Sequence, residues 1–197
     1  TSLIKDMNLL FSECSSLTSL DISNFDTKNV RDMRNMFSFC QLLKSIDLSH
    51  MDTSNVITMR EMFFSCESLV SLDLSNFNTQ KVTDMYCLFC NCLLLTSIDL
   101  SSFLISNTEI IESMFDGCQS LISLDLSSFD FYEKDISRLF NYCESLKIIK
   151  FPKNNNKFYG SLDYTFNMCQ SLLSIDIPNL DLSLITSMEA VFFYCLS

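Results

Sequence analysis

A pair of residues, Phe and Cys three positions apart, recurs along this chain at a nearly constant interval. The pair occurs eight times, and successive cysteines are 26 residues apart except for one interval of 25. A fixed period of this length predicts a repeat protein, in which each unit is too small to bury its apolar side chains alone and stacks on its neighbours. The pairs are Phe11/Cys14, Phe37/Cys40, Phe63/Cys66, Phe89/Cys92, Phe115/Cys118, Phe140/Cys143, Phe166/Cys169 and Phe192/Cys195.

Each unit contains two hydrophobic patterns. In residues 33–40 the apolar side chains are spaced i, i+3, i+4 and i+7, which predicts one face of a helix of about two turns. In residues 43–48 they alternate with Ser45 and Asp47, which predicts a short, half-buried strand. The strand pattern Leu-x-x-Leu-x-Leu is typical of leucine-rich repeats. We therefore predict an α/β leucine-rich-repeat solenoid of about seven stacked strand–turn–short-helix units, with a parallel sheet on its concave side.

The full unit resembles a particular branch of this class. Its motif, Met-Phe-x-x-Cys-x-x-Leu-x-x-Leu-Asp-Leu-Ser-x-Phe-x-Thr-x-x-Val-x-x-Met, is similar to BspA-like leucine-rich repeats, and more narrowly to the 26-residue surface-protein repeat of mycoplasmas, other bacteria and some protists. Residues 14–85 match it best, and residues 100–113 and 148–165 depart from it. The Asn ladder of commoner leucine-rich repeats is replaced by residues such as Phe25 and Met51. The resemblance implies a cell-surface or secreted protein with a role in adhesion or protein–protein contact.

The repeats fill residues 1–197, so we expect one domain, a single leucine-rich-repeat array. Thr1 is in register with Thr27, partway through a unit, and Ser197 comes two residues after the eighth cysteine of the repeat. Because solenoids need polar terminal caps, we expect this array to be a segment of a longer protein, with further repeats or subunits at both ends.

Charge and hydropathy exclude several classes of protein. The chain has 24 acidic and 13 basic residues, a net charge of −11, which argues against nucleic-acid binding because that needs a basic face. No stretch approaches the ~20 apolar residues that would span a bilayer, so we expect no membrane insertion by this segment.

The outward-facing strand positions form the candidate binding surface. At these positions an aspartate recurs once per unit, so the aspartates of stacked units form a column. The structural interpretation is that each Asp accepts hydrogen bonds from flanking serines, while solvent screens the repulsion between neighbouring carboxylates. The functional interpretation is an acidic surface that recruits cations or a basic partner protein. No Asp-x-Asp-x-Asp loop of a calcium site is present, so no metal is predicted. The candidate partner-binding residues are Asp21, Asp47, Asp73, Asp99, Asp125, Asp176 and, where the column is broken, Lys150.

One unit departs from the pattern around Lys150. Lys147, Lys153 and Lys157 add to a local basic spot. This spot is either neutral sequence variation that relieves the repulsion between stacked aspartates, or a site that recognises a partner. The apolar residues of 103–105 and 131–133 also depart, and we interpret them as an exposed contact patch.

The cysteine column is predicted to consist of free, buried thiols, because equivalent side chains in stacked units point the same way and are poorly placed to bridge. Two further cysteines, Cys87 and Cys90, form Cys-x-x-Cys-x-Cys with Cys92. A zinc or redox interpretation is open, but no second ligand cluster exists, and we expect a partly exposed thiol pair on one helix.

No catalytic constellation is present, so neither an enzyme nor a cofactor is predicted. The single His50 lies in a turn position, and the serines that flank the aspartates of the predicted strands have no base beside them to activate a nucleophile. The sequence favours a protein-interaction or adhesion module that binds through its acidic face and irregular repeats. Two alternatives remain: a structural spacer of a large surface assembly, or an intracellular adaptor, since free thiols suit a reducing, cytoplasmic compartment.

Overall fold

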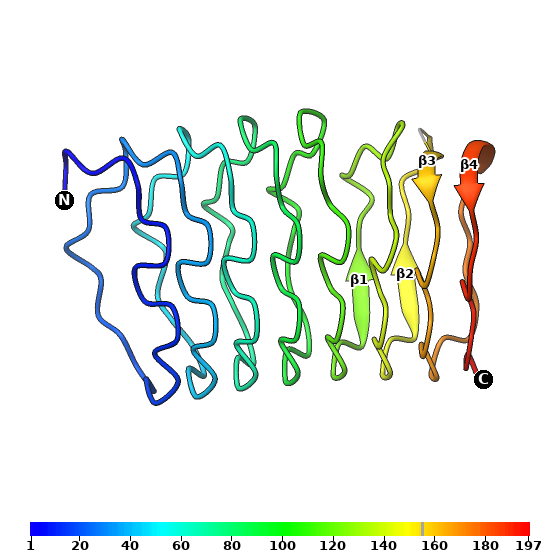
Figure 1. The fold of residues 1–197 in the computed structure, drawn as a ribbon, viewed down its shortest axis with the longest axis horizontal. Helices are drawn as coiled ribbons and strands as arrows, with labels where there is room; N and C mark the ends of the chain where they lie inside the picture. The colour runs from blue at the N-terminus through cyan, green and yellow to red at the C-terminus, as the bar shows by residue number, and fades with distance from the viewer. Residues whose placement is uncertain (155) are drawn as a thin grey trace.

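The chain winds into coils that are stacked side by side along one axis. The computed structural model describes residues 1–154 and 156–197, with the two termini at opposite ends of the row (Figure 1). Parallel bridges join equivalent positions of successive coils, from Asp6 to Asp32, Asp32 to Thr58, Thr58 to Asp84 and Asp84 to Ile110. The predicted repeat solenoid is therefore confirmed, whereas its count of about seven units and its concave curvature stay predictions.

Strand pairing is confined to the C-terminal part of the described chain. Strand β1 (Ser123–Asp125) pairs in parallel with β2 (Ile148–Lys150), and β3 (Lys157–Ser161) pairs in parallel with β4 (Asp181–Ser187). Within residues 1–122, all of which are described, the Leu-x-x-Leu-x-Leu segments form no strand.

The predicted short helix is wrong, since the described residues contain no helix. The amides of Asn35 and Phe37 donate to the carbonyls of Arg60 and Met62 in the next coil, each at 2.9 Å. An amide that is used between coils cannot make the i→i−4 hydrogen bond of a helix.

The backbone of this segment also turns too sharply for a helix. Asn35 (φ 53°) and Phe39 (φ 59°) adopt left-handed conformations, and turn hydrogen bonds run from Met36 to Met33 and from Cys40 to Phe37. This pair of positive φ angles, four residues apart, recurs in every coil, so the apolar spacing belongs to two successive turns and not to a helix. The pairs are Leu9/Glu13, Asn35/Phe39, Glu61/Ser65, Cys87/Asn91, Ser113/Gly117, Arg138/Tyr142, Tyr164/Met168 and Ala190/Tyr194.

Carboxylates and amides cap the corners of the coils and make glycine largely unnecessary there. A side-chain oxygen of Asp21, Asp26 or Asp32 accepts a hydrogen bond from the amide two residues further on. These three residues mark three corners of one coil, and the same cap recurs in later coils. Such Asx turns fix a tight bend without a glycine, which explains how the chain folds with only two of them.

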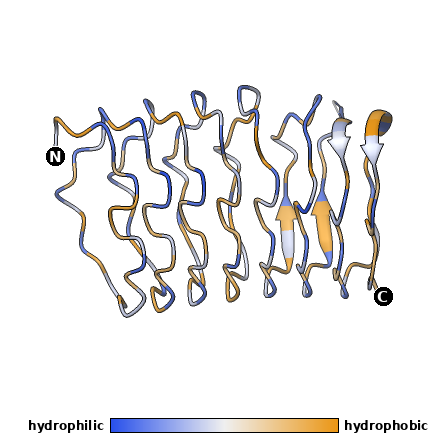
Figure 2. Ribbon diagram, in the orientation of Figure 1, coloured by the Kyte–Doolittle hydropathy of each residue, from blue (hydrophilic) through white to orange (hydrophobic). Residues whose placement is uncertain are grey.

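The core is built from columns of identical side chains. Eight phenylalanine rings, from Phe11 to Phe192, stack at centroid separations of 5.4 to 6.0 Å with interplanar angles of 4° to 15°. Hydrophobic residues recur in every coil and do not gather at one end (Figure 2). Each coil therefore buries its apolar side chains against its neighbours, as repeat stacking requires.

A threonine column adds polar links inside the array. The Thr53 hydroxyl donates to the Asn78 carbonyl (3.1 Å) and accepts from the Asn78 amide (2.7 Å). Thr79 makes the same pair of bonds to Leu104, at 3.0 and 2.8 Å. Both threonines are 1% exposed, so the bonds satisfy backbone groups that water does not reach.

Candidate functional site

The structure places all seven predicted partner-binding residues on the surface of the array. The five residues from Asp21 to Asp125 occupy equivalent corners of successive coils, and Lys150 lies directly opposite Asp125 in the β1–β2 register. We call the six aspartates of this set, Asp21, Asp47, Asp73, Asp99, Asp125 and Asp176, the acidic column.

Local hydrogen bonds fix five of these carboxylates. Each accepts a bond from the amide of the serine two residues on, at 2.9 to 3.0 Å, as in Asp21 to Ser23. The serine amides and hydroxyls favour the ionised form and hold the carboxyl pKa below its usual range. This holds for Asp21, Asp47, Asp73, Asp99 and Asp125.

The column changes character towards the C-terminus. Lys150 and Asp176 are each followed two residues later by a proline, Pro152 and Pro178, and proline has no amide hydrogen to donate. These two side chains therefore lack the serine amide cap of the other five positions.

Lys150 makes an ion pair with the preceding coil. Its Nζ lies 3.0 Å from Oδ2 of Asp125, and the two side chains are 67% and 54% exposed. The Ser127 hydroxyl and amide, together with Lys150, lower the pKa of Asp125 to about 2. The change from Asp to Lys thus relieves like-charge stacking at this junction, which was one of the two interpretations of the irregular unit.

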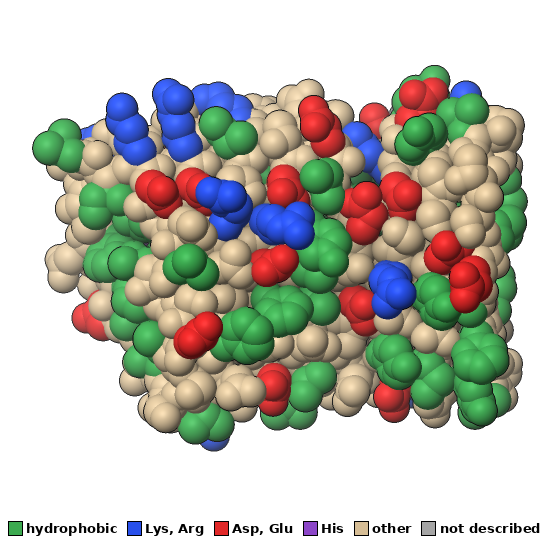
Figure 3. Space-filling model, viewed as in Figure 1, with side chains coloured by type: hydrophobic (Ala, Val, Ile, Leu, Met, Phe, Trp, Pro, Cys, Tyr) green, Lys and Arg blue, Asp and Glu red, His purple; other side chains and the backbone are tan. Residues whose placement is uncertain are grey.

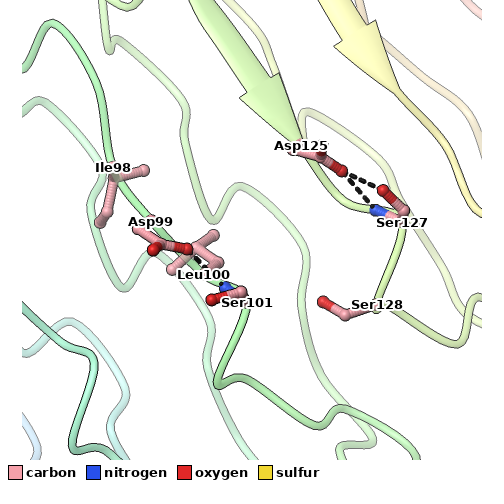
Figure 4. A pocket seen from close by; sticks show the side chains of 7 residues that line it. All are labelled: Ile98, Asp99, Leu100, Ser101, Asp125, Ser127 and Ser128. Atoms are coloured by element: carbon pink, nitrogen blue, oxygen red, sulfur yellow. Dashed lines mark hydrogen bonds between the residues drawn. The ribbon is translucent and has the colours of Figure 1, made fainter.

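An open pocket of about 410 Å³ lies on the acidic column between two coils (Figure 4). It is lined by Asp99 and Ser101 from one coil and by Asp125, Ser127 and Ser128 from the next. Both carboxylates are already engaged by their own serines (Figure 4). The pocket offers hydroxyls and fixed negative charge, which suits a cationic side chain.

No group of three or more His, Cys, Asp or Glu side chains is arranged as metal ligands within residues 1–154 and 156–197. His50, the single histidine, is half-buried, and its Nε2 has no hydrogen-bond partner in this part of the chain.

The predicted contact patch at the irregular segments is largely wrong. Phe103, Ile105 and Phe131 are at most 1% exposed, because they turn inward to fill the core. Of the apolar side chains in these two segments, Leu104 and Tyr132 remain exposed, at 43% and 51%. These are single side chains and do not form the continuous apolar surface that a contact patch requires.

Charged side chains of both signs share the face seen in Figure 3. Lysines and arginines gather along its upper edge, while acidic side chains are spread over its middle among hydrophobic ones. Elsewhere on the surface, charged side chains pair locally, including Arg34 with Asp32 (2.6 Å) and Lys157 with Glu133 (3.8 Å). The face drawn in Figure 3 therefore carries a mixture of both charges and not one sign alone.

The cysteine column has a structural role that the sequence did not specify. The thiol of Cys66 donates to the carbonyl of Phe37 in the preceding coil, at 3.2 Å. Seven of the eight column thiols make this bond, at 3.0 to 3.3 Å. Burial raises the pKa of these thiols, to about 11 for Cys40 and about 12 for Cys169. All ten cysteines are free, as predicted for the column.

The pair Cys87 and Cys90 differs from the prediction. Cys87 and Cys90 are only 5% and 6% exposed, so the expected partly exposed pair on a helix is wrong on both counts.

Asparagines also link coils: the Nδ2 groups of Asn29 and Asn55 donate to carbonyls of the preceding coil. The signal was their spacing of 26 residues, which continues to Asn107 after an interruption.

The described part of the chain contains no helix with the length and apolar character that crossing a membrane requires.

The stacked coils, their side-chain columns and their repeating register define a leucine-rich-repeat type of solenoid protein. A crystal structure of a leucine-rich repeat protein from Eubacterium ventriosum is similar, with a TM-score of 0.56 and 20% identity over 85% of this chain. This chain spans 41% of that protein's length. A leucine-rich repeat protein from Bacteroides ovatus matches 99% of this chain and 69% of its own, with 20% identity and a TM-score of 0.44.

The family model described as "Mycoplasma protein of unknown function, DUF285" matches residues 1–71 and 40–151. The chain therefore belongs to this family, and the resemblance to BspA-like leucine-rich repeats of the mycoplasma type is confirmed. No curated protein matches the chain.

Proposed function

We propose that this chain is a non-catalytic protein-interaction module of a cell-surface or secreted protein, and that it binds a basic partner protein through the acidic column and Lys150. Leucine-rich-repeat architecture supports a protein-interaction role in general, because stacked repeats present extended surfaces. The family resemblance supports the surface or secreted location.

One observation carries the choice of surface. Five ionised carboxylates recur at equivalent exposed corners, and each is held in place by its own serine amide. Fixed charges of one sign raise the local concentration of an oppositely charged partner and lose little side-chain entropy on binding. The neighbouring irregular unit, with Lys150 and Pro152, would set the register of the partner on an otherwise repetitive surface.

A structural spacer is the alternative function. The uninterrupted stack of eight phenylalanine rings favours it, since a continuous core makes a stiff rod. In that case the carboxylates serve only to cap turns, and specific contacts lie elsewhere.

A matched pair of variants separates capping from binding. Asp73→Asn with Asp99→Asn removes two charges but keeps an oxygen that can accept the serine amide, whereas Asp73→Ala with Asp99→Ala removes both charge and cap. A control, Glu13→Gln with Glu109→Gln, removes two exposed charges away from the column.

The probe is a synthetic lysine-rich peptide, titrated by fluorescence anisotropy, with thermal unfolding measured in parallel. A binding module is expected to lose affinity about tenfold in the Asn variant, with its melting temperature and the affinity of the Glu control unchanged. If the Asn variant binds as well as the original chain, the acidic column is not the binding surface. A loss of stability confined to the Ala variant would then support the spacer.

A further inference from the structure

One unit of the array contains two cysteines that the repeat does not require. Cys87 and Cys90 occupy positions that are Asn35 and Ser38 in one earlier unit. Both are free thiols, and neither belongs to the cysteine column. Their presence at i and i+3 in a single coil makes this coil chemically different from the others.

The backbone brings the two residues together in a tight turn. The Cys90 amide donates to the Cys87 carbonyl at 3.1 Å, and Cys87 has a left-handed φ of 51°. A turn closed in this way brings its first and fourth Cα atoms within about 7 Å, and disulfides span Cα separations of roughly 4.4 to 6.8 Å. The turn is therefore compatible with a bond between the two sulfurs.

The surroundings of this pair differ from those of the column thiols. Cys92 is 0% exposed, belongs to the continuous apolar core and donates to the Phe63 carbonyl. Cys87 and Cys90 retain 5% and 6% exposure and lie outside that core cluster. Within residues 1–154 and 156–197, neither thiol donates to a carbonyl in the way that the column thiols do.

The pKa values of the two thiols shift in opposite directions. Hydrogen bonds from the Cys90 thiol and the Tyr86 hydroxyl lower the pKa of Cys87, against the opposing effects of burial and of Asp116 and Glu61. The same bond raises the pKa of Cys90. One sulfur is thus favoured as the thiolate and the other as the thiol that supports it.

We propose that Cys87 and Cys90 form a redox-active thiol pair, which a small disulfide compound converts into an intramolecular disulfide. The Cys87 thiolate attacks the compound, forms a mixed disulfide and releases one thiolate. Cys90 then loses its proton and attacks the Cys87 sulfur, which releases the second. The protein loses two electrons and two protons overall, and the disulfide compound is reduced to two thiols.

The test uses hydroxyethyl disulfide on the folded chain, followed by peptide mapping. A Cys14→Ser background removes the exposed column thiol, which would otherwise react first. We expect the background protein to lose two hydrogen atoms and to yield a peptide linked between Cys87 and Cys90. Circular dichroism should show that the fold is kept, because the link closes within one turn.

Two further variants test the order of attack. Cys90→Ser is expected to accumulate a mixed disulfide on Cys87, and Cys87→Ser to react at Cys90 at least about tenfold more slowly. Equal rates in the two variants would overturn the assignment of Cys87 as the attacking thiol. If the background protein forms no Cys87–Cys90 link while Cys195 is modified, the proposal is wrong whatever the two variants do.

Discussion

The apolar columns and the acidic column of this array respond in opposite ways to the stacking of identical units. On one side, each phenylalanine ring stacks on an identical ring, and each cysteine thiol donates to a phenylalanine carbonyl of the preceding coil, so every copy strengthens the stack. On the other side, an ionised aspartate repeats, and each copy meets a like charge. Copying one unit therefore adds the same favourable apolar contact at every junction, whereas at the charged positions it adds a like-charge repulsion that opposes the serine hydrogen bonds of each carboxylate.

Strand pairing also differs along the acidic column. At the junctions within the acidic column from Asp21 to Asp125, the described strand segments form no ladder. At the next junction Asp125 faces Lys150, and there β1 and β2 pair. Two features distinguish this junction from the earlier ones: Lys150 faces Asp125, and the β-branched Ile148 stands where the earlier segments have serine.

The largest expected effect comes from ionising the thiol column. Burial raises the pKa of these thiols above the unfolded value of 9.0, to about 11 for Cys40. Their contribution to stability is therefore complete below pH 9.0 and is lost as the pH rises through the folded value. Each buried thiol should reduce the free energy of unfolding by about 1.4 kcal/mol per pH unit in that window. Denaturant unfolding between about pH 8 and about pH 10.5, with reductant present, measures this loss.

The acidic column gives the contrasting response. Its carboxyl pKa values are lowered, to about 2 for Asp125, so its contribution is present above the unfolded value of 3.8 and is lost only as the pH falls through the folded one. A flat stability profile up to about pH 10.5 would contradict the role given to the thiols.

The second prediction concerns the phenylalanine stack. Phe89 is 0% exposed and Phe192, at the last coil, is 57% exposed. Phe89→Ala should cost about 3–5 kcal/mol, whereas Phe192→Ala should cost about 1 kcal/mol or less because it leaves little cavity. Coupling between neighbouring units should also make unfolding of the Phe89 variant broad or two-step. Equal costs in the two variants would show that the stack does not hold the array together.

The solenoid could be predicted from the sequence, but the conformation of the turns could not. The Phe and Cys spacing fixed the register of every coil, since only stacking buries such columns. The spacing of the apolar residues in 33–40 fits a helix and a pair of tight turns equally well, because both structures place every third or fourth residue on one side. Residues such as Phe39 and Glu61 carry no sequence mark of a left-handed φ.

The candidate site could be predicted only in part. Alternation placed the aspartates on the surface, and the serine two residues on suggested their hydrogen bonds. The burial of Phe103 and Phe131 was missed, because a departure from the repeat does not say whether the chain turns inward or outward. The thiol-to-carbonyl bonds were missed since they join atoms 28 or 29 residues apart.

A third, smaller effect is expected at the threonine column. Thr79→Val keeps the shape of the side chain but removes both bonds to Leu104, which leaves a buried amide without its partner. This should cost about 1–3 kcal/mol in denaturant unfolding. Thr18→Val, at an exposed position, is the matched control and should change stability by less than about 0.5 kcal/mol. A cost for Thr79→Val no larger than that of the control would mean that neutral polar columns add nothing to the apolar ones.

The smallest effect tests the charge argument itself. Lys150→Asp restores a like-charge pair at the β1–β2 junction and should cost about 0.5–1 kcal/mol, because the side chains are exposed and screened. The Leu126 amide donates to the Lys150 carbonyl at 2.8 Å, so its hydrogen exchange should become faster as the strands separate.

Adding Asp125→Asn to that variant removes the like charge while keeping an oxygen for the Ser127 amide, and should slow the exchange of Leu126 again. High salt should do the same to Lys150→Asp alone, since it screens exposed charges. If exchange at Leu126 is unaffected by Lys150→Asp, strand pairing at this junction depends on backbone geometry and not on the facing charge.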